Sequence, residues 1–416
     1  MTDALVQLRH RSRRPDHARG EHPRYVVWEL TLECDQRCTH CGSRAADARD
    51  DELTTDEALD VVRQLAAAGA QEVTLIGGEA YLHPGFLAVV RAIVAAGMRA
   101  SMTTGGRALT AELAAQLAGA GMHSVAVSVD GLRATHDLVR ARRGSFDDAM
   151  AAIANVRATG LPVGCNTVVN RLNIDELEPL FETLLTAGIR GWQVQLVVPM
   201  GRAADRPDLL LQPWQLLDVV PRIARLKERA FAVGMLLMPG NNVGYYSRDE
   251  KLLRSTEPGG REHWRGCQAG RFVLGIEANG AVKGCPSLPT RGYVCGNLRH
   301  RSLASIWAET PELAFARVRT VDDLWGFCRT CAFAENCLAG CTFTTHSLLG
   351  RPGNNVYCHY RAKTLAADGL RERLVPAERA PGEPFDYGRY DIVREPFDAP
   401  APPQPQGLAA LRVWRG

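Results

Sequence analysis

Short apolar runs rich in β-branched residues alternate with longer Ala- and Leu-rich stretches over the first half of the chain. Each short run is typical of a buried parallel strand, and the runs lie at 26–32, 72–76, 99–103, 124–129, 162–169 and 192–198. The longer stretches predict helices near 55–68, 85–96, 110–120, 145–159, 173–187 and 213–233. Six strand–helix units in a row predict an α/β fold with a parallel sheet and helices outside it, short of the eight units of a closed TIM barrel.

The pattern changes on both sides of this core, which we place at 25–238. Residues 1–24 are polar, basic and aperiodic, and we expect a mobile arm. Residues 239–264 are rich in turn formers and predict a connector, and the cysteine-rich segment 265–362 predicts a second domain. In 363–416 we expect a helix followed by a Pro-rich tail, because the stretch that ends at 399–406 can bury little apolar surface.

Composition and charge indicate a globular protein without nucleic-acid or membrane partners. The chain has 416 residues, of which 46% are hydrophobic and 23% charged, and its net charge of +3 is too balanced to favour nucleic acid. It contains neither a secretory signal nor an apolar run long enough to span a membrane, so we expect a cytoplasmic location. In that compartment its 12 cysteines favour metal or cluster ligation over disulfides.

Three cysteines, Cys34, Cys38 and Cys41, follow directly on the first predicted strand with C-x3-C-x2-C spacing. Ligands gather at the carboxyl ends of strands in such sheets, which is where this triplet falls. Three thiolates are one short of the four that a cubane iron–sulfur cluster normally takes, so one iron would stay open. The alternatives are unrelated thiols or a structural zinc site, although zinc usually takes C-x2-C pairs and four ligands.

This spacing resembles the signature of the radical S-adenosylmethionine (radical SAM) superfamily. The resemblance implies a partial (β/α)6 TIM-like barrel and a [4Fe–4S] cluster whose open iron chelates the methionine end of S-adenosyl-L-methionine (SAM). The second predicted strand ends in Gly77, Gly78 and Glu79. Glycines let the backbone approach a ligand closely, and a carboxylate accepts hydrogen bonds from an ammonium group. In the family this motif holds the amino group of SAM.

Further candidate SAM contacts lie at the ends of the later strands. The stretch Ser128-Val-Asp-Gly, followed by His136-Asp137-x-x-Arg140, resembles one in SPASM-type radical SAM enzymes. The resemblance implies that Ser128 and Arg140 contact the SAM carboxylate, with Arg142 and Arg143 as rivals of Arg140, and we expect His136 and Asp137 to start a helix and to pack. Asn166 ends the fifth strand, and Gln193 and Gln195 share one face of the sixth; these polar side chains are either ligand-facing or structural.

Eight cysteines follow the connector. Cys267, Gly280 and Cys285 give C-x12-G-x4-C, and the later cysteines give C-x2-C-x5-C-x3-C and a last cysteine. This pattern resembles the SPASM domain, which implies two auxiliary [4Fe–4S] clusters: Cys267, Cys285 and Cys341 for the first, and Cys328, Cys331, Cys337 and Cys358 for the second. Cys295 lies outside the pattern and either completes the first cluster or is a plain thiol. Zinc is the alternative for the C-x2-C-x5-C-x3-C run. We expect Cys165, in an apolar run, to be a small buried hydrophobe.

The resemblance implies an enzyme that reductively cleaves SAM to a 5′-deoxyadenosyl radical, which removes hydrogen from a substrate. Relatives with both domains mostly modify peptides, so we expect crosslinking or oxidative maturation of a ribosomally made peptide, with a flavodoxin or ferredoxin-type reductant. About 24 residues precede the first strand, too few for a leader-binding domain, so a separate leader-binding protein is expected if the substrate has a leader. The alternatives are a small molecule or tetrapyrrole substrate, or a non-catalytic iron–sulfur or zinc-structured protein.

Overall fold

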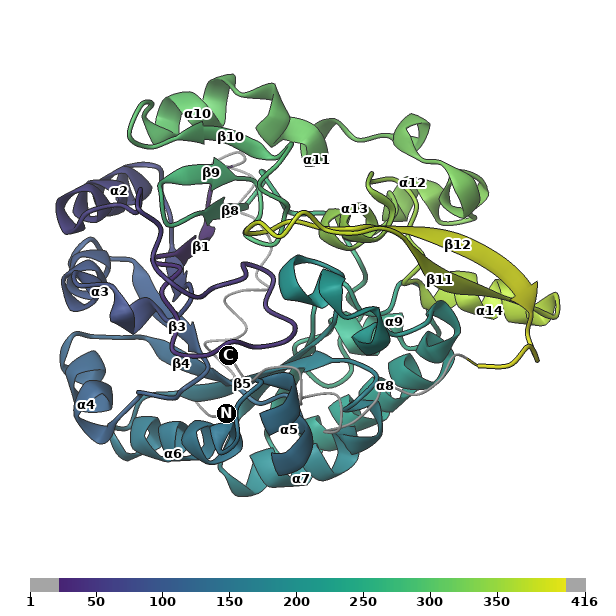
Figure 1. Cartoon of the computed structure of the whole chain (residues 1–416), viewed down its shortest axis with the longest axis horizontal. Helices are drawn as coiled ribbons and strands as arrows, with labels where there is room; N and C mark the ends of the chain where they lie inside the picture. Colours follow the sequence, from purple (N-terminus) through teal and green to yellow (C-terminus); the bar gives the residue numbers. More distant parts are fainter. Residues whose placement is uncertain (1–21, 402–416) are drawn as a thin grey trace.

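Seven parallel strands form the core of the fold, surrounded by helices (Figure 1). The computed structural model describes residues 22–401, so the predicted arm lies outside the described residues except for 22–24. The first six strands stand where the sequence predicted them. The parallel strands are β1 (Tyr25–Glu29), β2 (Glu72–Ile76), β3 (Arg99–Thr104), β4 (Ser124–Ser128), β5 (Val163–Val169), β6 (Gly191–Leu196) and β7 (Leu236–Pro239).

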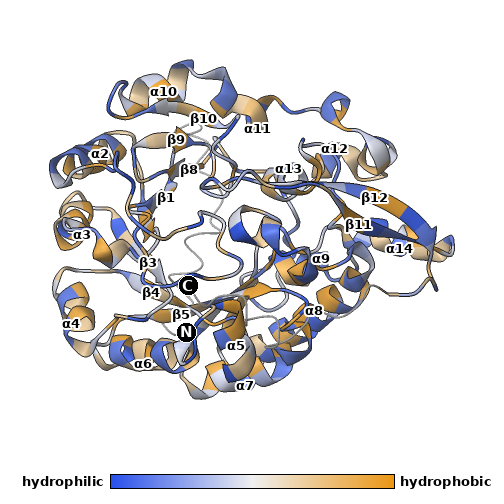
Figure 2. Cartoon of the chain, viewed as in Figure 1, coloured by the Kyte–Doolittle hydropathy of each residue, from blue (hydrophilic) through white to orange (hydrophobic). Residues whose placement is uncertain are grey.

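Six of the seven helices that cover this sheet match the predicted stretches, and the short helix at 133–139 was not among them. They are α2 (Thr55–Ala67), α3 (Phe86–Ala95), α4 (Ala111–Gly119), α5 (Arg133–Val139), α6 (Ser145–Ala158), α7 (Leu177–Thr186) and α8 (Leu216–Ala232). Thr54 begins α2 through a capping box with Glu57, which satisfies backbone donors at the helix start. Figure 2 shows both hydrophobic and hydrophilic residues on α6 and α7, as expected for helices with one buried face.

The two faces of the sheet differ in chemistry. Val26 and Trp28 of β1 are fully buried in the main apolar core together with Leu65 of α2. The opposite face carries polar side chains: the hydroxyl of Ser101 donates to Glu72 at 3.1 Å, and the hydroxyl of Ser124 donates to that of Ser101 at 3.1 Å. The strands therefore carry one apolar face, packed under the helices, and one face suited to polar ligands.

The cysteine-rich region continues the same sheet instead of forming a detached unit. Its first strand, β8 (Val273–Ile276), pairs in parallel with β1, and β9 (Ala281–Lys283) and β10 (Val294–Asn297) extend the edge in antiparallel order. The result is a ten-stranded sheet in the order β10-β9-β8-β1-β2-β3-β4-β5-β6-β7. The other elements here are α9 (Glu250–Arg254), α10 (Leu303–Glu309), α11 (Phe315–Val318), α12 (Ala334–Cys337), α13 (Thr342–Leu349) and α14 (His359–Ala367).

The expectation of a helix and an extended tail at 363–416 was wrong for much of that segment. After α14 the chain forms an antiparallel hairpin of β11 (Leu370–Glu378) and β12 (Arg389–Pro396), the long ribbon at the end of the colour scale in Figure 1. Tertiary contacts stabilise it: Glu372 pairs with Arg361 at 2.7 Å, both buried. The charged composition concealed this structure, because the charged side chains of the segment are paired and do not face solvent singly. Of the Pro-rich stretch, residues 402–416 lie outside the described residues.

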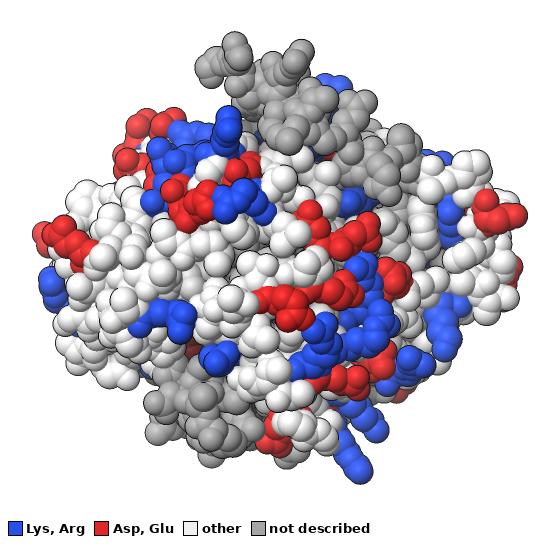
Figure 3. Space-filling model, turned by 90° about the horizontal axis from the view of Figure 1, so that it is seen from below, with Lys and Arg blue, Asp and Glu red and all other residues white. Residues whose placement is uncertain are grey.

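Lys and Arg side chains are interspersed with Asp and Glu over the face in Figure 3. Among residues 22–401, none of the helices is both long and apolar enough to cross a membrane.

Candidate active site and cysteine clusters

The loop that follows β1 brings together the three cysteines of the C-x3-C-x2-C motif. Arg202, in the segment after β6, holds this loop: its Nε donates to the carbonyl of Cys38 at 2.8 Å, and its backbone N–H donates to that of Cys41 at 3.0 Å. Burial raises the pKa of the Cys34 thiol well above its usual range, and the charges of Glu79, Cys38 and Cys41 raise it further. The sulfurs of the three cysteines and the Glu79 carboxylate thus lie close together.

The Gly-Gly-Glu motif at the end of β2 packs directly against this loop. A β-carbon at Gly77 would lie 2.3 Å from the carbonyl oxygen of Thr31, and one at Gly78 would lie 1.8 Å from that of Glu33, so only glycine fits at either position. The backbone N–H of Glu79 donates to the carbonyl of Glu33 at 2.8 Å. The close approach of β2 to the loop therefore depends on the two glycines.

The Glu79 carboxylate is aimed at the cysteine loop. One oxygen accepts from the Thr104 hydroxyl at 2.6 Å and the other from the backbone N–H of Gly105 at 2.7 Å. Ligand atoms of Cys34, Asp35 and Glu79 lie within 4.8 Å of one another. Burial raises the pKa of Glu79 to about 7, although its hydrogen bonds oppose the shift. A cation beside this buried carboxylate would stabilise its charged form.

Arg140 lies between the cysteine loop and a buried carboxylate. Its Nη1 donates toward the Cys38 sulfur at 3.6 Å, and its Nη2 lies 2.6 Å from Asp130. The Nε2 of His40 lies 3.2 Å from the same carboxylate. Burial alone would raise the pKa of Asp130, but Arg140 and His40 hold it well below its usual range. The rivals of Arg140 are placed differently, because Arg142 pairs with Asp148 and Arg143 is exposed.

The polar residues at the ends of later strands lie on the polar face of the sheet. Ser128 ends β4 in register with Asn166 of β5, and the Asn166 amide donates to the Thr103 hydroxyl at 3.5 Å. Gln193 and Gln195 alternate with buried residues along β6, so they share a face as predicted. Ser128 and Gln195 thus lie at or next to the ends of β4 and β6. The expectation that Asn166 ends the fifth strand was wrong, because β5 continues to Val169 and Asn166 lies in its middle.

His136 and Asp137 have the packing and helix-start roles expected of them. The His136 ring accepts from the backbone of Asp130 at 3.0 Å, and the Asp137 carboxylate accepts from the backbone of Gly144 at 2.7 Å and of Phe146 at 2.8 Å, at the start of α6. Cys165 is 1% exposed within the main apolar core, which confirms the expected small buried hydrophobe.

Four of the later cysteines enclose an apolar cavity. Its lining combines them with aromatic rings, and Tyr246 stacks on Phe333 with ring centroids 4.2 Å apart. Burial and the neighbouring sulfurs raise the pKa of Cys358 to about 12, so its free thiol is uncharged, and a metal that binds it would displace the proton. Four thiols around one apolar space fit a fully thiolate-ligated cluster. The four are Cys328, Cys331, Cys337 and Cys358.

A second group contains Cys267, Cys285 and Cys341. Burial raises the pKa of Cys285 to about 12, and the charges of the other two sulfurs raise it further. Cys295 lies elsewhere: it is buried in the main apolar core, and its sulfur is 3.3 Å from the carbonyl of Tyr293. Its pKa rises to about 11 through burial and Glu312, without a contribution from the three cysteines among the described groups. The structure groups three of the four candidate ligands and separates Cys295 from them.

Aromatic residues that the sequence analysis missed connect this group with the first cysteine loop. Tyr293 packs against Cys267 and Cys285, and its hydroxyl lies 2.9 Å from the Nδ1 of His346. The His346 ring meets the Tyr387 ring edge to face at 4.8 Å, and Tyr387 pairs through its backbone with Met200, beside the cysteine loop. No local motif marks these residues, since they belong to separate elements that meet only in the fold.

Comparison with known proteins agrees with this geometry. A model of the radical SAM superfamily matches residues 28–184, and a model of an iron–sulfur cluster-binding domain, SPASM, matches residues 267–332. An AdoMet-dependent heme synthase of Methanosarcina barkeri is 30% identical over 82% of this chain and 97% of its own. The chain belongs to the radical SAM superfamily. Mycofactocin maturase MftC of Mycobacterium tuberculosis is 27% identical over 90% of each chain.

Solved radical SAM structures share the fold. The structure titled anSMEcpe with bound AdoMet and a peptide has a TM-score of 0.65 and 16% identity, covering 82% of this chain and 95% of that one. SuiB bound to its precursor peptide SuiA has a TM-score of 0.62 and 14% identity, covering 82% and 75%. The predicted partial barrel with a SPASM domain is confirmed.

This radical SAM chain is therefore an enzyme whose cofactors are [4Fe–4S] clusters and SAM. Its thiols fit that assignment, because they gather in groups of three and four around separate spaces. The alternatives of a zinc-structured or non-catalytic protein are not supported, since the superfamily match covers the core and the cluster-domain match covers most of the later cysteines.

Proposed function

We propose that this enzyme uses SAM-derived radical chemistry to crosslink or oxidise a ribosomally made peptide. The observation that carries the proposal is the similarity to mycofactocin maturase, which extends over 90% of each chain and so includes most of the barrel and of the SPASM domain. The polar face at the ends of β4, β5 and β6 gives a peptide backbone hydrogen-bonding partners there.

In this proposal Cys34, Cys38 and Cys41 hold the cluster that binds SAM. When bound, that cluster supplies one electron that splits SAM into methionine and a 5′-deoxyadenosyl radical. Glu79 accepts hydrogen bonds from the SAM ammonium, and Gly77 and Gly78 leave room for the methionine end. These roles rest on the proximity of Glu79 to Cys34 and on the tight packing of the two glycines.

The other proposed contacts with SAM or substrate come from polar side chains near the loop of the first cysteine triplet. Arg140 and Ser128 bind the SAM carboxylate, and Arg140 would exchange part of its contact with Cys38 for it. Asn166 and Gln195 orient SAM or the substrate, because both lie on the polar face of the sheet. Asp130 keeps the guanidinium of Arg140 in place through the 2.6 Å ion pair.

Two auxiliary clusters would occupy the two later groups of cysteines. Cys267, Cys285 and Cys341 hold the first, and Cys295 would have to turn out of the apolar core to serve as its fourth ligand. The second takes four thiolates from Cys328, Cys331, Cys337 and Cys358. When bound by these cysteines, the clusters would supply an acceptor for the electron released on oxidation of the substrate radical, and the electrons for SAM cleavage would come from a flavodoxin or ferredoxin-type protein. A separate leader-binding protein presents the peptide if the substrate has a leader.

Co-expression with short peptides encoded beside the gene tests the proposal. Mass spectrometry should reveal a peptide that has lost pairs of hydrogen atoms, and the change should disappear with Cys38→Ala, which removes a proposed ligand of the SAM cluster. Unmodified peptides, together with SAM cleavage that no neighbouring peptide stimulates, would contradict a peptide substrate.

A tetrapyrrole substrate is the second candidate, favoured by the 30% identity to an AdoMet-dependent heme synthase over 97% of that protein. A parallel assay adds an iron tetrapyrrole with propionate side chains to the reduced enzyme and SAM, and follows the side chains by mass spectrometry. Conversion of the tetrapyrrole without any peptide product would favour this function over peptide maturation.

A further inference from the structure

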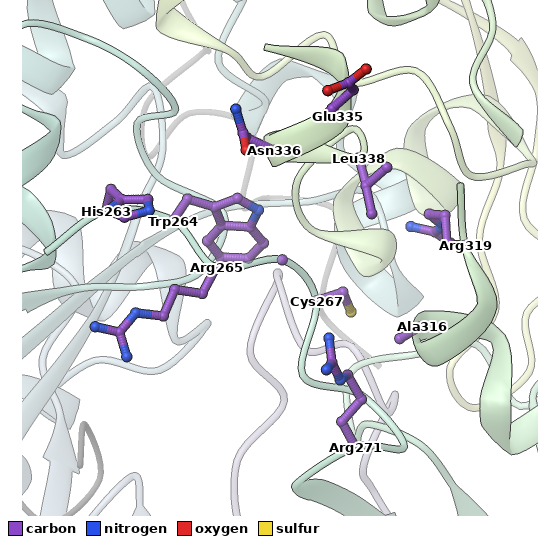
Figure 4. A pocket seen from close by; sticks show the side chains of 11 residues that line it. His263, Trp264, Arg265, Cys267, Arg271, Ala316, Arg319, Glu335, Asn336 and Leu338 are labelled. Atoms are coloured by element: carbon purple, nitrogen blue, oxygen red, sulfur yellow. The ribbon is translucent and has the colours of Figure 1, made fainter. Parts of the chain in front are cut away.

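A cavity of about 260 Å³ opens beside Cys267 and has no part in the function proposed above. It lies between the segment before β8 and the helices α11 and α12 (Figure 4). The lining residues are His263, Trp264, Arg265, Gly266, Cys267, Arg271, Ala316, Arg319, Glu335, Asn336 and Leu338. The cavity thus touches the group of cysteines assigned to the first auxiliary cluster.

The cavity is adjacent to that cluster position and is not the cluster position itself. Only Cys267 of the three grouped cysteines lines it, whereas Cys285 and Cys341 do not. The cavity at the second group differs in this respect, because all four cysteines of that group line it. A ligand beside Cys267 would therefore lie next to the first auxiliary cluster, on the side of its Cys267 ligand.

Positive charge dominates the lining. The lining contains three arginines and one histidine but only a single carboxylate, Glu335. In Figure 4 Arg271 and Arg319 extend toward the space next to the Cys267 sulfur, whereas Glu335 and Arg265 point away from it. Arg265 instead lies 3.7 Å from Glu262. Arg271 and Arg319 are therefore the guanidinium groups that a ligand beside the Cys267 sulfur would meet.

Arg319 is held in place without its charge being neutralised. Its Nη1 donates to the Thr342 hydroxyl at 2.9 Å, and its guanidinium carbon lies 5.6 Å from the centre of the Phe315 ring. Within residues 22–401 no carboxylate lies within ion-pair distance of it. A guanidinium has five N–H donors in a fixed plane, so most donors of Arg319 remain for a ligand.

We propose that this cavity binds a carboxylate group of a ligand from solution, with Arg271 and Arg319 as its partners. A planar carboxylate matches the planar guanidinium, which can donate two parallel hydrogen bonds to it. The volume is below the roughly 300–1,000 Å³ of sites for drug-sized ligands, so the cavity accepts a small acid or the acidic end of a longer molecule. A whole tetrapyrrole does not fit. The inference rests on the proposed function only for the cluster at Cys267.

A bound carboxylate would also change the neighbouring cluster. The reduction potential of an iron–sulfur cluster depends on nearby charge and on solvent exposure. An anion beside Cys267 disfavours the added electron, so it lowers the potential of the first auxiliary cluster. Occupancy of the cavity would then govern how readily this cluster accepts an electron.

Calorimetric titration of the full, anaerobically reconstituted protein with citrate tests the proposal. We expect saturable binding, weakened roughly ten- to hundredfold by Arg319→Gln or Arg271→Gln, the range for loss of a charge-assisted hydrogen bond. Arg319→Lys, which keeps the charge, should bind better than Arg319→Gln. Arg265→Gln is the matched control, since Arg265 lines the same cavity but points away, and it should bind like the unchanged protein. Citrate should also lower the auxiliary potential measured by redox titration.

Two further probes identify the source of the carboxylate. Competition with citrate by N-acetylglycine but not by N-acetylglycinamide would indicate the carboxyl end of a peptide, and competition by neither would indicate a small free acid. Absence of saturable citrate binding, or equal weakening by Arg265→Gln and Arg319→Gln, would overturn the proposal; the arginines would then only offset cluster charge. Peptide modification and SAM cleavage are measured in separate assays, so failure of the proposed function can be distinguished from failure of the carboxylate-binding proposal.

Discussion

Arg44 and Asp386 form an ion pair, with Nε 2.8 Å from Oδ1, although 342 residues separate them in the chain. Arg44 belongs to the loop of the first cysteine triplet, and Asp386 lies at the tip of the C-terminal hairpin. Next to this pair, the backbone N–H of Phe385 donates to the carbonyl of Gly42 at 3.1 Å. The hairpin tip is therefore fixed against the loop of the first cysteine triplet.

Asp386→Asn should loosen this attachment. Both side chains are largely buried, but Arg44 keeps a second partner in Asp205, so we expect a loss of about 1–3 kcal/mol and not the full cost of an uncompensated charge. Anaerobic thermal unfolding measures the loss, and the rate of iron release to a chelator should rise. Asp391→Asn, in an exposed pair of the same hairpin, is the control and should change little. Equal effects of the two variants would contradict a fixing role for the pair.

The positions of the barrel strands and helices were predictable because the spacing of apolar residues within each short segment determines them. Strands such as β2 and β5 are short apolar runs bounded by turn residues, and their positions follow from burial between helices and sheet. These features require no knowledge of how distant segments meet. The cysteine groups were expected from the resemblance to the SPASM domain and not from local spacing, since Cys341 joins Cys267 and Cys285 from a segment 56 residues beyond Cys285.

The features missed by the sequence analysis depend on distant segments. The pairing of β8 with β1 joins segments far apart in the chain. The hairpin of β11 and β12 is attached to the barrel by contacts such as the hydrogen bond from the backbone N–H of Leu374 to the Gln212 side chain, 162 residues away. The attachment of Arg202 to the cysteine loop spans 164 residues. Composition even favoured the wrong structure for the hairpin, because its charged residues pair with one another instead of facing solvent singly.

Alanine at Cys34, Cys38 and Cys41 together should abolish 5′-deoxyadenosine formation but leave the auxiliary clusters in place. The later cysteines form groups of their own, around spaces that none of the triplet lines. Iron and sulfide analysis, together with liquid chromatography of SAM products, measures both effects. Continued 5′-deoxyadenosine formation would rule out the assignment of the triplet to the SAM cluster.

Glu79→Gln should weaken SAM binding roughly ten- to hundredfold, because the SAM ammonium loses a charged acceptor. Equilibrium dialysis of the reconstituted protein with labelled SAM gives the dissociation constant. Glu33→Gln provides a matched control: it removes an exposed carboxylate of the same loop and should leave the constant unchanged. If SAM binds equally well to Glu79→Gln and to the control, Glu79 does not hold the ammonium.

Cys295→Ser should leave the iron content unchanged, whereas Cys285→Ser should lower it. The Cys295 sulfur faces the main apolar core, and the Cys285 sulfur lies with Cys267 and Cys341. Iron analysis and the electron paramagnetic resonance spectrum of the reduced protein distinguish the two variants. Loss of iron from Cys295→Ser would show that Cys295 is the fourth ligand of the first auxiliary cluster.

Lys227 of α8 provides a prediction about stability and pH. Its side chain is fully buried, and its ammonium donates to the carbonyl of Leu253 at 2.9 Å. Burial, and to a smaller extent Arg254, lowers the pKa of Lys227 from 10.5 to about 7. Between these values the unfolded chain holds a proton that the folded protein has released, so the contribution of Lys227 to stability rises with pH. At pH 7 and below, the buried charge is a net cost.

Lys227→Met should therefore stabilise the protein at pH 7, by about 1–3 kcal/mol, since a buried charge is replaced by an apolar side chain of similar length. The gain should shrink at pH 9, where the folded protein already holds the neutral amine. Thermal unfolding of both proteins under anaerobic conditions at the two pH values measures the difference. Lys251→Met, an exposed lysine of α9, is the control and should show no such pH dependence. A destabilised Lys227→Met at pH 7 would mean that the hydrogen bond to Leu253 outweighs the cost of burying the charge.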